Sequence, residues 1–83
     1  MNNARRKILE SRKARLEEIQ EELNGIKDEI EGVKDDEQEA KDNLPESQQD
    51  GERGEAMDTA IENMDSAMTS IGEAVDYIGE AVA

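Results

Sequence analysis

The chain has 83 residues with 23 acidic and 10 basic side chains, a net charge of −13 at pH 7. It contains no cysteine and no histidine, which excludes disulfides, thiolate metal sites and the commonest catalytic base. Hydrophobic residues make up 34% of the chain and charged residues 40%, a composition typical of coiled coils or disordered segments. We therefore expect a protein that is not an enzyme and that needs no cofactor or metal.

Residues 1–16 are basic and are expected to form a helical arm. They contain six basic residues against one acidic residue, Glu10, so the arm carries +5 and residues 17–83 carry −18. No apolar stretch resembles a signal peptide or the roughly 20 residues of a membrane span, so a cytoplasmic location is the default expectation. The basic residues of the arm are Arg5, Arg6, Lys7, Arg12, Lys13 and Arg15.

Residues 17–44 are predicted to form the first helix of a coiled coil. Apolar residues recur in alternating steps of three and four from Leu9 to Leu44, which is the spacing of a heptad seam. In heptad letters, the a positions are Leu9, Leu16, Leu23, Ile30, Glu37 and Leu44, and the d positions are Arg12, Ile19, Ile26, Val33 and Ala40.

The heptad pattern breaks at Asn43-Leu44-Pro45, since proline disfavours helical geometry in the residue before it. Residues 45–54 are therefore expected to connect two helices. Within them, Ser47 and Asp50 have the spacing of a capping box, which predicts a short helical turn.

Residues 55–83 are predicted to form the second helix. Its seam is Met57, Ile61, Met64, Met68, Ile71, Val75, Ile78 and Val82, again with steps of four and three. The two seams match when the helices run antiparallel, with Leu44 opposite Met57 and Val33 opposite Met68. This register also brings Lys41 near Asp58 and Lys34 near Asp65. The expected fold class is all-α, an antiparallel two-helix coiled-coil hairpin.

A second stripe on residues 55–83 consists almost entirely of small residues. Together with glycines on the first helix it indicates a packing surface between copies, which predicts a homodimer, with a four-helix bundle as its form. The alternative is that alanine is present only as a good helix former. The expected self-association residues are Gly25, Ala60, Ala67, Ala74, Tyr77 and Ala81.

The segment Ser11-Arg12-Lys13-Ala14-Arg15, followed by leucine heptads, resembles the basic region and zipper of bZIP proteins. That resemblance implies nucleic-acid binding through the arm. Ala4, Lys7 and Ile8 stand where the bZIP pattern has an asparagine and two alanines, and the acidic remainder would repel phosphates. Direct nucleic-acid binding is therefore kept only as an alternative, and no membrane binding is expected.

Two motifs, Asp42-Asn43-Leu44-Pro45-Glu46-Ser47 and Gly51-Glu52-Arg53-Gly54-Glu55-Ala56-Met57, precede an acidic, alanine-rich helix. With that helix they resemble small acidic helical-hairpin proteins of phages and mobile elements in Gram-positive bacteria, over residues 27–83. The resemblance brings no established activity. It implies a role like that of the small acidic phage proteins that block host machinery, among them anti-CRISPR and other anti-defence inhibitors that mimic nucleic acid, in the host cytoplasm.

The sequence thus predicts an acidic coiled-coil module that binds a protein with a basic surface and blocks its nucleic-acid site. A homo-oligomeric assembly factor is the main alternative. The acidic residues expected to contact the partner are Glu29, Asp35, Asp36, Glu39, Glu62, Asp65 and Asp76.

Overall fold

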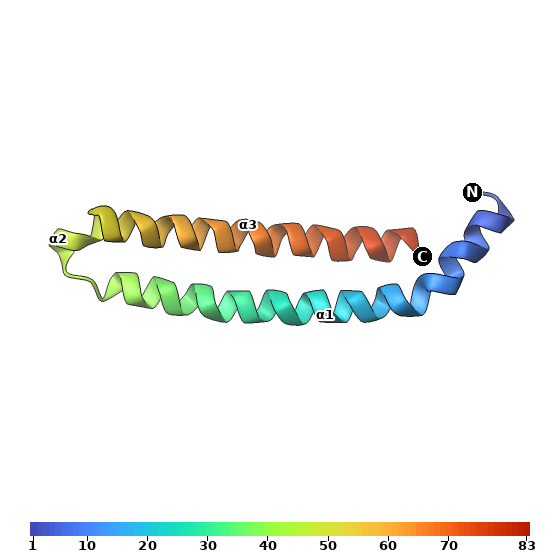
Figure 1. Cartoon of the computed structure of the whole chain (residues 1–83), viewed down its shortest axis with the longest axis horizontal. Helices are drawn as coiled ribbons and strands as arrows, with labels where there is room; N and C mark the ends of the chain where they lie inside the picture. Colours follow the sequence, from blue (N-terminus) through green and yellow to red (C-terminus); the bar gives the residue numbers. More distant parts are fainter.

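The computed structural model describes residues 1–83 and is all-α, as the heptad pattern predicts. Its helices are α1 (Asn3–Asp42), α2 (Glu46–Gln49) and α3 (Glu52–Ala81). The two long helices lie side by side and run in opposite directions, with α2 at one end of the rod (Figure 1). The rod measures 63 × 19 × 13 Å. None of its helices combines the length and the apolar character that crossing a membrane requires.

The basic arm is the first part of α1 and continues into the rest of that helix without a break. Asn2 caps it, because the Asn2 side chain accepts a hydrogen bond from the Arg5 backbone N–H at 2.9 Å. The arm extends past the end of α3 and turns toward the C-terminus (Figure 1). Within it, the Ser11 hydroxyl donates to the Ile8 carbonyl at 2.7 Å, an interaction that bends helices.

α1 ends at Asp42, just before the predicted break, and the chain reverses through α2. The predicted short helical turn in the connection is confirmed as α2, but its predicted cap is wrong: α2 begins at Glu46, so Ser47 lies inside the helix, and no side chain caps it. The Gln49 side chain closes the turn instead, since its Nε2 donates to the Leu44 carbonyl at 2.9 Å. The same amide lies 3.5 Å from the Asp42 carbonyl, one of the backbone oxygens that the end of α1 leaves free.

α3 begins at Glu52, inside the segment 45–54 that was expected to connect the helices. Gly54 is buried in its first turn, against α2. A Cβ atom at this position would lie 1.8 Å from the Gln49 carbonyl oxygen, so no other residue fits without moving α2. Gly54 is required for close approach and not for unusual backbone angles, because no residue of the chain has a positive φ.

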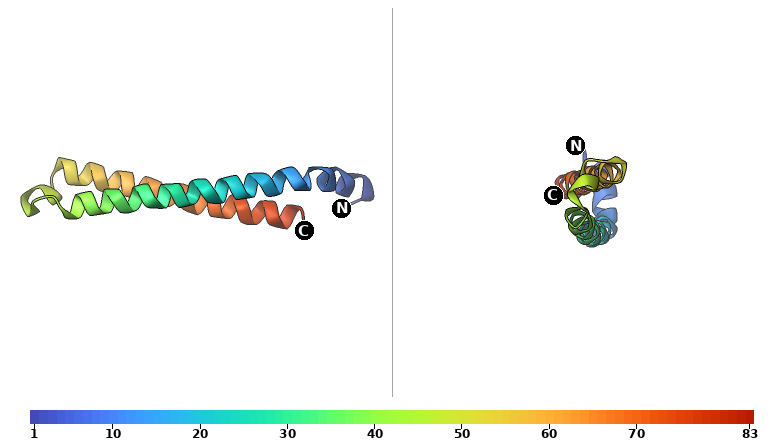
Figure 2. Two further views of the ribbon diagram at one scale, coloured as in Figure 1. Left: turned by 90° about the horizontal axis from the view of Figure 1, so that it is seen from below. Right: turned by 90° about the vertical axis from the view of Figure 1, so that its left-hand side faces the viewer.

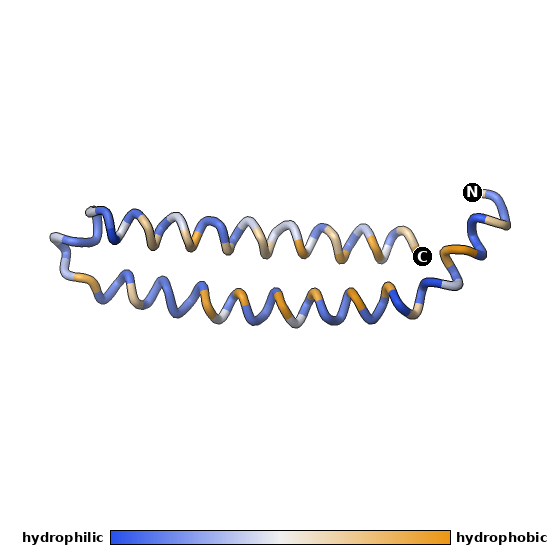
Figure 3. The backbone as a smooth tube through the Cα atoms, viewed as in Figure 1, coloured by the Kyte–Doolittle hydropathy of each residue, from blue (hydrophilic) through white to orange (hydrophobic).

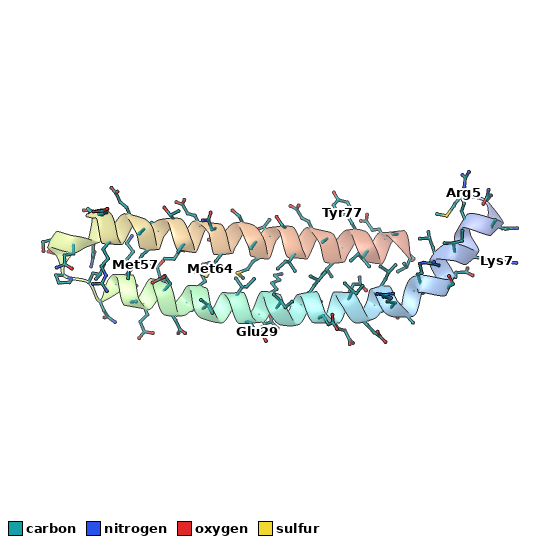
Figure 4. All side chains as sticks on the ribbon, in the orientation of Figure 1. Arg5, Lys7, Glu29, Met57, Met64 and Tyr77 are labelled. Atoms are coloured by element: carbon teal, nitrogen blue, oxygen red, sulfur yellow. The ribbon has the colours of Figure 1, made fainter.

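Most of the apolar residues of α1 and α3 lie along the line where the helices meet (Figure 3). Met57 and Met64 point from α3 toward α1 (Figure 4). Ile61 is the only buried hydrophobic residue, with 8% of its surface exposed. The other seam residues of α3 are half-buried, so a single chain leaves much of its apolar surface in contact with water.

The helices wind around each other (Figure 2), but α1 does not use the face that its apolar pattern predicts. Val33 and Ile26, both at d positions, are 58% and 47% exposed. The prediction that Val33 lies opposite Met68 within the seam is therefore wrong, and Ile26, at another predicted seam position, is not buried there either. The half-buried residues from 16 to 44, apart from Ile19, occupy a and e positions: Leu16, Gln20, Leu23, Lys27, Ile30, Lys34, Glu37, Lys41 and Leu44.

Glycines occupy two of the e positions of α3 that face the inward e positions of α1. A Cβ atom at Gly72 would lie 3.5 Å from the Lys27 Nζ, and one at Gly79 would lie 3.4 Å from the Gln20 Nε2. The Gln20 amide also donates to the Val75 carbonyl at 2.9 Å. The aliphatic stems of long polar side chains can pack on apolar surface. The side chains of Lys27 and Gln20 therefore lie over the two glycines, with the e positions of α1 facing inward.

Candidate protein-binding surfaces

The side of the rod where the e positions meet carries two ion pairs. The Lys34 Nζ lies 2.5 Å from the Asp65 Oδ1, and Lys41 pairs with Asp58. Both pairs are those that the antiparallel register predicts, so this part of the prediction is confirmed. The hydrogen bond to Asp65 raises the pKa of Lys34, and the charges of Asp65, Asp35 and Glu31 raise it further.

The acidic residues predicted to bind a partner are all exposed, but they do not form one surface. The α1 group occupies c, f and g positions, which face away from α3, as Glu29 does in Figure 4. The α3 group occupies b and e positions, next to the ion pairs. The first group is Glu29, Asp35, Asp36 and Glu39, and the second is Glu62, Asp65 and Asp76.

A shallow groove of about 370 Å³ runs along α3 beside the second group. Three carboxylates line it, from Asp65, Glu73 and Asp76, together with the ammonium group of Lys27. The sequence prediction missed Glu73. Its signal is the adjacent Gly72, which has no side chain and so leaves the surface hollow at this point. No group of three carboxylates in the molecule is arranged to hold a metal ion.

The opposite side of the rod is apolar. Since the e positions of both helices meet on one side, the d positions of α1 and the g positions of α3 lie on the other. Ile26 and Val33 are exposed there, beside Ala67 and Ala74. We call these four residues the open face. Three exposed carboxylates at the g positions of α1 lie along its outer edge, on the part of α1 farther from α3: Glu22, Glu29 and Asp36.

Of the residues predicted to mediate self-association, the four alanines occupy g positions of α3 on the side of the open face, whereas Gly25 and Tyr77 occupy c positions outside it. Ala67 and Ala60 are half-buried, whereas Ala74 and Ala81 are exposed. Tyr77 is 69% exposed and points away from α1 (Figure 4). A Cβ atom at Gly25 would have nothing within 4 Å. Sequence reasoning missed Ile26 and Val33 as surface residues, because their apolar character assigned them to the seam.

The arm presents a third surface, which is both basic and apolar. All six of its Lys and Arg residues are exposed, with Arg5 and Lys7 pointing into solvent (Figure 4). Where α1 extends beyond α3, Leu9, Leu16 and Ile19 line an apolar groove of about 310 Å³ that Arg12 and Arg15 flank. Ile8, next to this groove in the sequence, is 56% exposed.

No protein-family model matches this chain, and neither does any curated protein or solved structure. A function has to be argued from the three surfaces themselves. They are the acidic faces of both helices, the open face, and the basic arm. Each is elongated and exposed, which suits contact with another macromolecule better than enclosure of a small one.

Proposed function

We propose that the chain is an antiparallel coiled-coil hairpin that binds the basic, nucleic-acid-binding surface of another protein. The observation that carries this proposal is the excess of unpaired acidic side chains along the rod. Only Asp58 and Asp65 take part in ion pairs, while residues 17–83 have a net charge of −18. Rows of free carboxylates attract a basic groove over a long range and speed association at low salt.

A protein that fills such a groove would keep nucleic acid out of it and so inhibit its partner. The resemblance to small acidic phage proteins supports this role, as anti-CRISPR or other anti-defence inhibitors of that kind act in the host cytoplasm. The acidic residues of α1 are the first choice for the contact surface, because none of them is paired with a lysine or an arginine.

Competition for DNA tests this proposal. Fluorescence anisotropy would follow a labelled DNA duplex bound to each of several basic nucleic-acid-binding proteins, bacterial nucleases among them, as the chain is added. We expect release of the duplex from at least one of them, and weaker release at higher ionic strength. Absence of release from every protein at low ionic strength would contradict the proposal.

Two charge-matched variants locate the contact surface. The first neutralises α1, with Glu29→Gln, Asp35→Asn, Asp36→Asn and Glu39→Gln. The second neutralises α3, with Glu62→Gln, Glu73→Gln, Asp76→Asn and Glu80→Gln. Both raise the net charge by the same amount, so a larger loss of competition in the first assigns binding to α1. Equal losses would mean that total charge matters and that no particular face does.

Self-assembly is a second candidate function, and the open face favours it. Two copies that pack their open faces together would cover Ile26 and Val33 and form a four-helix bundle. Ala67→Glu with Ala74→Glu would place charge in that interface and should leave monomers, because burying an unpaired charge is costly. Sedimentation equilibrium measures this, and a monomeric wild type would overturn it.

A further inference from the structure

We propose that the basic arm of one copy docks on the open face of a second copy, so that two chains exchange their arms. This inference rests on the proposed self-association and names the segment that covers the open face. The unfilled core of the single chain motivates it: Ile61 is its only buried hydrophobic residue. Two helices in contact along one line cannot shield the remaining apolar side chains, so a further helix is needed.

The basic arm has the charge expected of a helix that covers the open face. The open face is bordered by Glu22, Glu29 and Asp36, none of which has a cationic partner within the chain. The arm carries +5, and its lysines and arginines are likewise unpaired. Pairing two arms with each other, or two acidic faces, would bring like charges together. Placing an arm on the open face instead brings opposite charges together along the whole contact.

Both surfaces also have apolar side chains at their centre. On the open face these are Ile26 and Val33. On the arm they are Ile8 and the groove formed by Leu9 and Leu16. The long stems of arginine cover apolar surface while their charged ends reach outward, which is how the arm could meet the bordering carboxylates. Alanines on the α3 side of the open face leave room for a helix to approach closely.

The lengths of the two surfaces agree. At 1.5 Å per residue, a helical arm of residues 1–16 is about 24 Å long, and α1 from Glu22 to Asp36 is about 21 Å long. One side of the arm shares a hollow with the end of α3, which Arg6, Leu9 and Lys13 line together with residues 80–83. Its other side faces no helix of its own chain (Figure 1). A two-fold axis would let each arm lie on the other chain's open face and make the contact reciprocal.

Charge reversal tests this arrangement in the full chain. One variant reverses the arm with Arg12→Glu and Arg15→Glu, and another reverses the border of the open face with Glu22→Lys and Glu29→Lys. In sedimentation equilibrium at low ionic strength, we expect each to raise the dimer dissociation constant by at least about tenfold, since both arms then meet like charge. An equimolar mixture of the two variants should form a heterodimer, because every arm then meets opposite charge again.

The matched control reverses Glu21→Lys and Asp28→Lys, which are acidic neighbours on the outer surface of α1. It changes the net charge as the border variant does and should leave dimerisation intact. Circular dichroism of each variant checks that helix content is preserved, and a variant that loses helix is replaced by Arg12→Gln with Arg15→Gln or by Glu22→Gln with Glu29→Gln.

Each outcome decides between the proposals. A monomeric wild type overturns both self-association and arm exchange. A dimer that all charge variants leave unchanged overturns arm exchange alone. Weakened variants whose mixture fails to form heterodimers show that the arm docks elsewhere, which also overturns it. A monomeric wild type that binds a labelled DNA duplex, and loses that binding with Arg12→Glu and Arg15→Glu, would assign the arm to nucleic acid instead.

Discussion

α1 and α3 contribute different side chains to the side of the rod where their e positions meet. α1 provides three lysines and a glutamine, all half-buried. α3 provides aspartate or glycine at the matching positions. The four pairs are Lys41 with Asp58, Lys34 with Asp65, Lys27 with Gly72, and Gln20 with Gly79.

This difference points to a cause for the rotation of α1. Glycine and short acidic residues on α3 accept the long side chains of α1, so α1 turns its e positions inward. The same rotation moves Ile26 and Val33 out of the seam and onto the open face. The inward position of the α1 e residues on one side of the rod is therefore linked to the apolar open face on the opposite side.

The largest expected effect contrasts Ile61 with Val33. Ile61→Ala should lower the free energy of unfolding by about 2 kcal/mol or more, because it removes buried methyl groups from the seam. Val33→Ala should change it by less than about 0.5 kcal/mol in dilute protein, where chains are separate. Thermal unfolding followed by circular dichroism measures both. Similar losses for the two variants would mean that Val33 lies in the seam after all.

A second contrast compares a glycine where an added methyl group would overlap its neighbours with one where it would contact nothing. Gly54→Ala should destabilise the chain by roughly 1–3 kcal/mol, because the new methyl group overlaps the Gln49 carbonyl. Gly25→Ala should stabilise it by about 1 kcal/mol, since alanine is the better helix former and this site is open. Urea unfolding of both variants is the measurement, and a neutral Gly54→Ala would show that α2 can move away.

The proposed cause of the rotation can be tested directly. Gly72→Leu with Gly79→Leu should push Lys27 and Gln20 off α3 and return α1 toward its a and d seam. In a Val33→Cys background, the thiol should then react more slowly with a soluble alkylating reagent than it does with both glycines present. Unchanged or faster reaction would mean that the glycines do not control which face α1 presents.

The smallest expected effect is the alkaline response of the Lys34–Asp65 pair. The pKa of Lys34 is raised above its ordinary value of 10.5 by the hydrogen bond to Asp65. The pair therefore stabilises the fold fully below pH 10.5 and loses this effect as the pH rises through the raised pKa. The difference in unfolding free energy between wild type and Lys34→Gln should be constant at neutral pH and shrink above that value. If this difference in unfolding free energy stayed constant into strong alkali, the raised pKa would not belong to Lys34.

Most of the helical architecture could be predicted from sequence because it depends on local rules. Proline ends α1 near the expected residue, and heptad spacing gives both helices and the two ion pairs. The rotated face of α1 could not be predicted from its apolar pattern. It coincides with glycines at positions 72 and 79 of the other helix, whose lack of a side chain hydropathy does not register.

The candidate surfaces were predictable to a similar degree. Exposure of the acidic residues follows from their charge, which is too costly to bury unpaired. Their division between two faces depends on how each helix is rotated, and the open face depends on the same rotation. The requirement for Gly54 was also missed, because it arises from the approach of α2 to α3 and not from local sequence.

The elongated shape of the rod has a consequence for measuring its mass in solution. Its radius of gyration is 18.8 Å, whereas a compact chain of this length would have about 12 Å. A globular protein would need roughly 280 residues to reach the same radius. Because elution from a size-exclusion column depends on hydrodynamic size, an elongated single chain should elute ahead of a globular protein of its own mass. Column elution alone would therefore overstate the number of chains, which has to be obtained from methods that report mass independently of molecular shape.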